Sequence, residues 1–509
     1  MKTWNFELGT LNSRCAVAAL TLIAYASFCN DGQAQVQQAW VTHYNNRIAN
    51  GKHQALRMAL DFSGNIYITG FSQNSFSNIG YATLKYTPSS SQLWVARYDS
   101  TNYPMGSPTA IALDSQGQPA ITGTAVTLKY DADGNQLWAA PYAGLAIAAD
   151  SNRNTFVTGF GTDFDTVKLS PTGSNLWLAT YKDVGPTVGQ AIGVDNTGNA
   201  CVSGSDIYMY YSNGAYTGHY AQLLTVGFAS NGVLLWTNGY PTFGTLVQVP
   251  AIALDKANNF YVAANFNTSP DYAIFKFLNG GGIAWSSSLG GSGSASALSI
   301  DHASEVLLTG QMPRDYPNFA YGTGKLDANG SRVWLSYFPG NVAHYPESPV
   351  QDSLATGIAT DIANNVFVTG YSPDANGTND IVTIAYDTNG KQLWLERYSG
   401  AANAGAVGNA IAVDKGGNVY VAGYENVAGG GTEMVLIKYA PVTLQHQTNG
   451  NFLLQAQGAA GEPFDIRATT NLQTWLDLGT NNADTNGILQ YLDTNAPLYP
   501  WRFYLAIPQ

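Results

Sequence analysis

Three segments of the chain gather side chains that can contact a ligand or transfer a proton. Ser205–Gln222 carries Tyr208, Tyr210, Tyr211, Tyr216, His219 and Tyr220, Gln311–Gly322 carries Arg314, Asp315 and Tyr316, and Asn341–Ser353 carries His344, Glu347 and Asp352. Tyrosine rings offer a flat apolar face with a polar tip, and histidine and carboxyl groups exchange protons. We predict that these residues contact a ligand. The alternative is that the tyrosine-rich segments pack on themselves.

A further set of acids recurs at one fixed place along the chain. Eight apolar runs end in an aspartate, and a small residue follows nine positions after each: the aspartates are Asp61, Asp114, Asp150, Asp195, Asp255, Asp301, Asp361 and Asp414. A ring of carboxylates would offer oxygen ligands to a metal. An aspartate at a strand end also accepts backbone N–H bonds within a turn. Because all of them share one repeat position, we predict the turn role.

Other metal and nucleophile signals are incomplete. Asp131–Asn135 (DADGN) and Asp374–Asp380 (DANGTND) resemble calcium loops, but neither has the closing bidentate acid of an EF-hand. The six histidines are isolated in sequence, and no Gly-x-Ser-x-Gly elbow is present. We therefore predict no catalytic residue, no metal ligand and no cofactor, with calcium as the alternative at the two loops. Cys201 lies in a strand pattern and is predicted to be a buried structural thiol.

These residues are positioned by a repeat with two constant spacings. In Ala410–Gly423 (AIAVDKGGNVYVAG), an apolar strand ends at aspartate, Gly and Asn supply a turn, and β-branched and aromatic residues run back. The second spacing joins the end of a third strand to a tryptophan eight positions later, as from Tyr386 to Trp394. Each unit is therefore predicted to be two hairpins, or four antiparallel strands.

Length varies only in the connections outside these spacings. The connection between the two hairpins of a unit is shortest from Gly123 to Tyr130 and longest from Gly204 to Phe228. The connection from one unit to the next is shortest from Trp138 to Asp150 and longest from Trp334 to Asp361. Radially stacked four-stranded units form a β-propeller. All variable connections then leave one face, here called the long-loop face, and the hairpin turns occupy the opposite, tight-turn face. Long loops on a rigid scaffold commonly carry binding sites, so we expect ligand contacts on the long-loop face.

The chain ends predict ring closure. Gln38–Tyr44 is a lone outer strand with Trp40, whereas the last repeat ends at Val435–Ala440 without a tryptophan strand. Trp40 can complete that blade and seal the sheet edges. This gives eight blades, or seven if the short unit Asp114–Tyr142 is absorbed irregularly.

At this level of detail the repeat resembles a known family. The stretches ALDFSGNIYITGFS and YATLKYTPSSSQLWVARY closely resemble the seven-bladed β-propeller repeat family of exported bacterial proteins. The resemblance covers about residues 38–440 and implies a propeller fold, although eight units depart from the family's name. It implies no catalytic constellation.

The regions outside the repeat have their own patterns. Residues 1–34 predict a secretory signal peptide, because Lys2 and Arg14 precede the apolar run Cys15–Phe28 and small residues allow cleavage after Ala34; an uncleaved anchor is the alternative. The propeller is assigned to 36–440, and alternating runs in 442–509 predict a small β-sandwich-like domain. This domain resembles the C-terminal modules of exported repeat proteins. Trp475 and Trp501 are predicted to be core residues of that domain.

Charge and composition narrow the choice of function. The net charge is −12, and the 22 Lys and Arg residues form no basic cluster, which argues against nucleic acid. Our main hypothesis is an exported, monomeric, non-catalytic binding or scaffold protein, secreted, cell-surface or periplasmic, without a transmembrane segment in the mature chain. It would hold a protein or polysaccharide on its long-loop face. The alternative is a hydrolase or lyase acting on polysaccharide, with Asp315, Glu347 and Asp352 at the axial mouth.

Overall fold

The computed structural model divides the chain into two compact units. It describes residues 35–48, 50–75, 78–99, 106–161, 163–183, 185–212, 215–241, 247–267, 272–290, 293–315, 318–339, 352–471, 474–499 and 502–508. One unit is Ala39–Pro441, and the other combines Met1–Gln38 with Val442–Gln509. Within the described ranges, no helix has the length and hydrophobicity needed to cross a bilayer. The signal peptide predicted for residues 1–34 lies outside the described residues.

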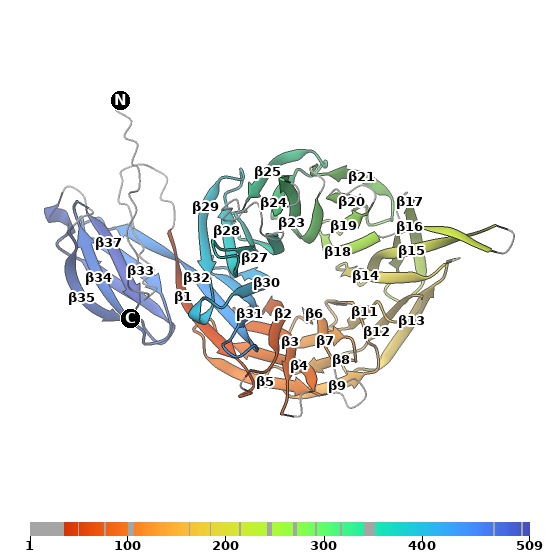
Figure 1. Cartoon of the computed structure of the whole chain (residues 1–509), viewed down its shortest axis with the longest axis horizontal. Helices are drawn as coiled ribbons and strands as arrows, with labels where there is room; N and C mark the ends of the chain where they lie inside the picture. Colours follow the sequence, from red (N-terminus) through yellow and green to blue (C-terminus); the bar gives the residue numbers. More distant parts are fainter. Residues whose placement is uncertain are drawn as a thin grey trace. The chain divides into compact units, whose positions relative to one another are not determined.

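The larger unit is a β-propeller made of antiparallel four-stranded blades (Figure 1). The first four blades are β2 (His53–Leu60), β3 (Ile66–Gln73), β4 (Ile79–Tyr86) and β5 (Gln92–Tyr98); β6 (Pro108–Leu113), β7 (Pro119–Gly123), β8 (Thr127–Tyr130) and β9 (Gln136–Ala140); β10 (Ala146–Ala149), β11 (Thr155–Thr158), β12 (Phe164–Leu169) and β13 (Asn175–Tyr181); and β14 (Thr187–Val194), β15 (Ala200–Ser212), β16 (Ala215–Phe228) and β17 (Leu234–Pro241). The next three are β18 (Val247–Leu254), β19 (Phe260–Phe266), β20 (Ala273–Phe277) and β21 (Ile283–Ser288); β22 (Ser294–Ile300), β23 (Val306–Asp315), β24 (Asn318–Leu326) and β25 (Arg332–Phe338); and β26 (Leu354–Thr360), β27 (Val366–Pro373), β28 (Asn379–Tyr386) and β29 (Gln392–Tyr398).

The eighth blade joins the two ends of the propeller sequence. It consists of β30 (Ala406–Val413), β31 (Val419–Asn426), β32 (Thr432–His446) and β1 (Gln35–Tyr44), which pairs with β32. The first strands of neighbouring blades contact one another in succession, and β2 lies against both β6 and β30. The ring is therefore closed. Eight blades and the role of the Trp40 strand are confirmed, and the seven-bladed alternative is wrong.

Six outer-strand tryptophans each hydrogen-bond their blade to the next one. The Trp94 indole Nε1 donates to the Ala132 carbonyl at 2.9 Å, in the second hairpin turn of the following blade. The same bond is formed by Trp40, Trp138, Trp177, Trp285 and Trp334 with Pro88, Pro171, Ser230, Ala328 and Thr388. The bond from Trp40 to Pro88, 3.2 Å long, spans the seam between the eighth and first blades. The constant tryptophan spacing thus places each of these indoles over a neighbouring turn.

The same turns need glycine for two independent reasons. Gly330 has φ +84°, and an added Cβ would lie 2.9 Å from the Trp285 ring. A positive φ disfavours residues with a Cβ even where space is free. Equivalent glycines press against the preceding tryptophan at Gly134, Gly173, Gly232, Gly281 and Gly390. Strand ends are also tied internally, as by the buried ion pair of Lys129 Nζ with Asp114 Oδ2 at 2.8 Å.

The smaller unit is a β-sandwich built of two sheets. One sheet joins the β32 segment from Val442 to β33 (Phe452–Gln457) and β36 (Ile488–Asp493), and the other orders β35 (Leu476–Asn482), β34 (Pro463–Thr469) and β37 (Phe503–Pro508). Its buried cluster includes Leu454, Phe464 and Tyr504. Two short 3-10 turns complete the described elements, η1 (Ala401–Asn403) in the propeller and η2 (Ala496–Leu498) here. The small β-sandwich is confirmed, Trp475 is half-buried, and Trp501 lies outside the described residues.

Candidate functional site

The repeated aspartates organise the turns that surround the propeller axis. Asp61 Oδ1 accepts the backbone N–H groups of Ser63 and Asn65, each at 2.9 Å. The same two bonds, to the second and fourth residues onward, form at Asp114, Asp150, Asp195, Asp255, Asp301, Asp361 and Asp414. The predicted turn role is confirmed, and each turn presents the residue after its aspartate at the tip.

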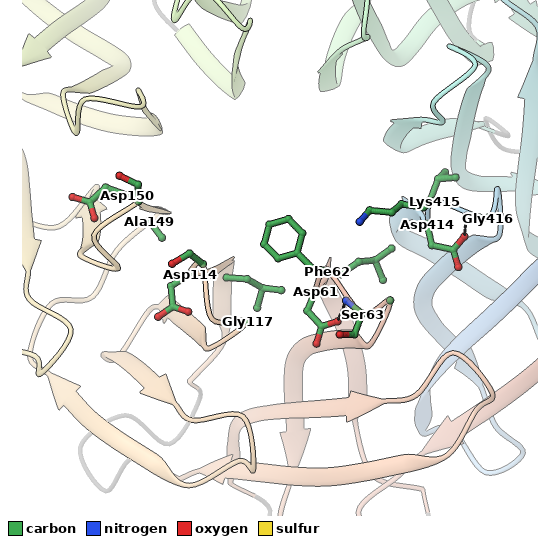
Figure 2. A pocket seen from close by; sticks show the side chains of 16 residues that line it. Asp61, Phe62, Ser63, Asp114, Gly117, Ala149, Asp150, Asp414, Lys415 and Gly416 are labelled. Carbon is green, nitrogen blue, oxygen red and sulfur yellow. Dashed lines mark hydrogen bonds between the residues drawn. The ribbon is translucent and has the colours of Figure 1, made fainter. Parts of the chain in front are cut away.

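A cavity of about 590 Å³ lies among four of these turns on the tight-turn face. Its lining comes from the first hairpin turns of the eighth, first, second and third blades. The residues that matter chemically are Phe62, Ser63, Ser115, Ser151 and Lys415. Because the innermost strands converge there, the cavity marks the axial mouth of the propeller on this face (Figure 2).

Phe62 and Lys415 give the mouth an aromatic face and a cation. Phe62 is 80% exposed although it is a large apolar side chain. Lys415 Nζ lies 5.9 Å from the centroid of the Phe62 ring, at the outer limit of a cation–π contact. Figure 2 shows both side chains reaching into the opening, while the Asp61 and Asp414 carboxylates turn back towards their own turns. Asp414 Oδ2 accepts from the Asn418 amide and the Tyr420 hydroxyl.

The first predicted ligand segment is a β-hairpin arm on the long-loop face and not an irregular loop. The flanking strand β14 pairs with β15 only as far as Asp206, which lies opposite Thr187. The other flanking strand, β17, pairs with β16 only as far as Gln222, which lies opposite Pro241. β15 and β16 continue together to Ser212 and Ala215, and Figure 1 shows this pair extending outward from the ring. The extension arises because β-branched and aromatic residues continue to favour paired strands.

The structure brings two of the predicted tyrosines together on the arm. The Tyr208 and Tyr220 rings stack with centroids 4.9 Å apart and planes 7° apart. His219 lies opposite Met209, which is 42% exposed. Tyr210, Tyr211 and Tyr216 lie in the paired backbone, but their side chains are outside the described part.

A partly buried polar network holds the base of the arm. Tyr208 Oη donates to Asp183 Oδ2 at 2.8 Å, and Gln222 Nε2 donates to Asp206 Oδ2 at 2.7 Å and to Tyr208 Oη at 3.0 Å. Burial, together with the nearby Asp183 carboxylate, raises the pKa of Asp206. Because Asp206 is fully buried, it cannot meet a macromolecular substrate, and we assign this network to positioning the arm.

The remaining predicted residues are placed only in part. The segment with Arg314 and Asp315 is also a hairpin extension, since β23 and β24 pair as far as Asp315 and Asn318. The side chains of Arg314 and Asp315 are outside the described part, as are all of Tyr316, His344 and Glu347. The ligand contacts predicted for these five residues therefore lie outside the described part of the chain.

Asp352 is the predicted acid whose surroundings the structure does describe. It is half-buried, and burial raises its pKa despite a backbone hydrogen bond at Phe319. Its Oδ1 atom is buried and, within the described part of the chain, has no hydrogen-bond partner. A raised pKa favours the protonated form of a carboxyl group, which is the form that a proton donor needs.

Two further sequence expectations concern metal and thiol chemistry. Asp131 Oδ1 accepts from Asp133 and Asn135, and Asp374 Oδ1 accepts from Asn376 and Thr378, in the same turn pattern as above. Among the described residues, no three His, Cys, Asp or Glu side chains cluster for a metal ion. Cys201 is fully buried, and burial raises the pKa of its thiol, as expected for a structural cysteine.

Sequence reasoning missed the axial mouth on the tight-turn face because it searched for binding residues in the connections of variable length, which lie on the opposite face. The signal was present at the position directly after each repeated aspartate, where polar residues predominate: Phe62, Ser115, Ser151, Asn196, Lys256, His302, Ile362 and Lys415. Phenylalanine and isoleucine stand out there, and the structure leaves both exposed, Phe62 by 80% and Ile362 by 71%.

Comparison with known proteins identifies neither a family nor an activity for this chain. No protein-family model and no curated protein matches the chain. Among solved structures, virginiamycin B lyase from Staphylococcus aureus is 11% identical, with 79% of this chain and 99% of that chain covered and a TM-score of 0.40. A protein of unknown function from Dyadobacter fermentans is 10% identical, with 80% and 99% covered and a TM-score of 0.34. A gluconolactonase from Xanthomonas campestris is 13% identical, with 54% and 95% covered and a TM-score of 0.28.

Proposed function

We propose that this chain is an exported, non-catalytic binding protein that holds a partner protein against its long-loop face, with the β15–β16 arm as the main contact. The observation that carries the proposal is the continuation of two strands beyond a four-stranded blade. An isolated two-stranded ribbon is only marginally stable in water, so its extension beyond the blade adds little to folding. A partly buried hydrogen-bond network at Asp183, Tyr208 and Gln222 nevertheless fixes its direction.

The shape of the arm favours a protein over a polysaccharide. Small ligands and sugar rings are usually bound in concave sites that cover most of their surface. A projecting hairpin is convex, and a protein partner can surround it on several sides. The stacked Tyr208 and Tyr220 rings and the exposed Met209 supply aromatic and flexible apolar contacts of the kind enriched in interfaces.

The test shortens the arm without disturbing its base. Met209–His219 is replaced by Asn-Gly, which closes a two-residue hairpin turn and retains the pair of Tyr208 with Tyr220. A partner captured from culture medium or cell surface is purified, and its affinity for both chains is measured. We expect at least about a tenfold loss, equivalent to about 1.4 kcal/mol. Lys391→Ser, on the opposite face, serves as the control. Equal affinity of the shortened chain would contradict the proposal, and selective binding of a polysaccharide by the arm would reassign the partner class.

A hydrolase or lyase acting on polysaccharide is the second candidate, supported by Asp352 alone. Its raised pKa and its buried Oδ1, unpartnered in the described part, suit a proton donor on the long-loop face. This candidate predicts release of reducing ends from a polysaccharide panel, lost in Asp352→Asn. Binding without turnover in the wild-type chain would support the non-catalytic role.

A further inference from the structure

The axial mouth on the tight-turn face carries side chains that folding does not require. Phe62 occupies the tip of a turn whose equivalents in the next two blades are Ser115 and Ser151. The Phe62 side chain is 80% exposed, so its ring gains little from burial, which is what normally stabilises a phenylalanine. The turn itself is formed by the bonds of Asp61 and is independent of the residue at its tip. An exposed aromatic ring at the edge of a cavity is therefore a candidate contact for a ligand.

Aromatic, cationic and hydroxyl groups line this cavity together with four aspartates, Asp61, Asp114, Asp150 and Asp414. Phe62 offers a flat apolar face, Lys415 offers a positive charge, and Ser63, Ser115 and Ser151 offer hydroxyl groups. In the described part of the chain, Lys415 forms no carboxylate ion pair. Its Nζ lies 5.9 Å from the Phe62 ring centroid. A cation–π contact of that length is weak enough for a ligand anion to compete with it.

The neighbouring aspartates keep their negative charge, but each one is held by its own blade: Asp114 pairs with Lys129 and Asp150 pairs with Lys168. Asp61 and Asp414 each accept two backbone N–H bonds and an asparagine side chain. Their oxygen atoms are committed to the turns, and Figure 2 shows them pointing away from the opening. The Lys415 ammonium therefore reaches into the opening while the carboxylates stay at its wall, in a chain whose net charge is −12.

From this arrangement we propose that the axial mouth of the tight-turn face binds a saccharide that carries a carboxylate, a hexuronic acid residue. The apolar C–H face of the sugar ring would lie on Phe62, its carboxylate would pair with Lys415, and its hydroxyl groups would bond to the serines. The cavity volume, about 590 Å³, falls within the range of small-ligand sites. The strongly negative chain disfavours a polyanion at longer range, so a chain end or a single residue is the expected ligand.

The experiment measures binding of glucuronate and galacturonate to the full chain by calorimetry and ligand-observed NMR. Glucose tests the requirement for a carboxylate, and benzoate tests the requirement for a sugar. Phe62→Ser introduces the residue found at the equivalent turns, and Lys415→Gln removes the charge. Ile362→Ser changes an equally placed, 71% exposed residue that does not line the cavity, and is the matched control. Circular dichroism confirms that each variant folds.

We expect roughly millimolar affinity for uronates, weakened about tenfold by Phe62→Ser and about fivefold by Lys415→Gln. Salt should weaken uronate binding to the wild-type chain more than to Lys415→Gln, and Ile362→Ser should bind like the wild type. Absence of uronate binding to the wild type, equal weakening by Ile362→Ser, or binding of benzoate without uronate would each overturn the assignment. Because the site lies on the opposite face, the arm-shortened chain should retain uronate binding, which separates this proposal from the proposed function.

Discussion

Replacing Trp40 tests whether the N-terminal strand closes the ring. The Trp40 side chain is 6% exposed, its ring centroid lies 6.1 Å from that of Tyr420, and its Nε1 donates to the Pro88 carbonyl. Burying an indole removes roughly 200 Å² from water, worth up to about 5 kcal/mol at roughly 25 cal/mol per Å². Measured truncations of buried aromatics to alanine cost about 3–5 kcal/mol. We therefore expect Trp40→Ala to lower the free energy of unfolding of the seam by about 3–5 kcal/mol.

The matched control is Trp138→Ala at an internal boundary between blades. Trp138 is 8% exposed, and its Nε1 donates to the Pro171 carbonyl at 3.0 Å. Its local cost should be similar, because burial and hydrogen bonding are similar. The extent of local unfolding should differ between the two variants. Trp138 lies on β9, which a short turn connects to its partner β8, whereas Trp40 lies on β1, which no turn connects to its partner β32.

Native-state hydrogen exchange read residue by residue distinguishes the two variants. In Trp40→Ala, protection should fall first in β1 and in the facing part of β32, with β6 to β13 unchanged. In Trp138→Ala, protection should fall around β9 and β12 while β1 remains protected. If Trp40→Ala costs less than about 1 kcal/mol, or if the loss spreads equally over all blades, the closure argument is wrong.

Three further predictions concern turns, a buried ion pair and pH. Gly330→Ala should cost about 2–4 kcal/mol in urea unfolding, because it adds a Cβ against the neighbouring tryptophan at positive φ. Gly417 has φ +78° and nothing within 4 Å of an added Cβ, so Gly417→Ala should cost only about 1 kcal/mol in the same assay. Lys129→Met should cost about 3–5 kcal/mol by leaving the Asp114 carboxylate buried without its cation, and adding Asp114→Asn should recover part of that loss. Burial raises the pKa of Glu396 from 4.5 to about 7. Between about pH 4.5 and pH 7 the folded chain therefore keeps a proton on Glu396 that the unfolded chain has lost, and the free energy of unfolding falls as the pH rises through this range. Glu396→Gln should flatten that slope by at most about 1.4 kcal/mol per pH unit, and an unchanged slope between about pH 5 and 7 in thermal unfolding would contradict the assignment.

The sequence predicted the fold because the repeat encodes local geometry. The aspartate spacing fixes one hairpin and the tryptophan spacing fixes the other, since both depend on turns of constant length. The seam was also predictable, because Trp40 matches the tryptophan that the last repeat lacks. The long segments were harder to interpret. Length variation located them correctly outside the constant hairpins, but it could not show that Ser205–Gln222 continues as paired strands, since strand pairing beyond the blade depends on register.

What the sequence alone determined about this protein is its periodic part: four strands per unit, eight units, and a small second β unit, because short-range turn chemistry and alternating burial specify them. What only the tertiary structure decided is which residues meet across blades. Phe62 and Lys415 come from opposite ends of the propeller sequence, and Asp183 reaches Tyr208 across a blade boundary. Such meetings depend on ring closure and on the direction in which each turn points its tip. Those are properties of the assembled ring that no single repeat carries.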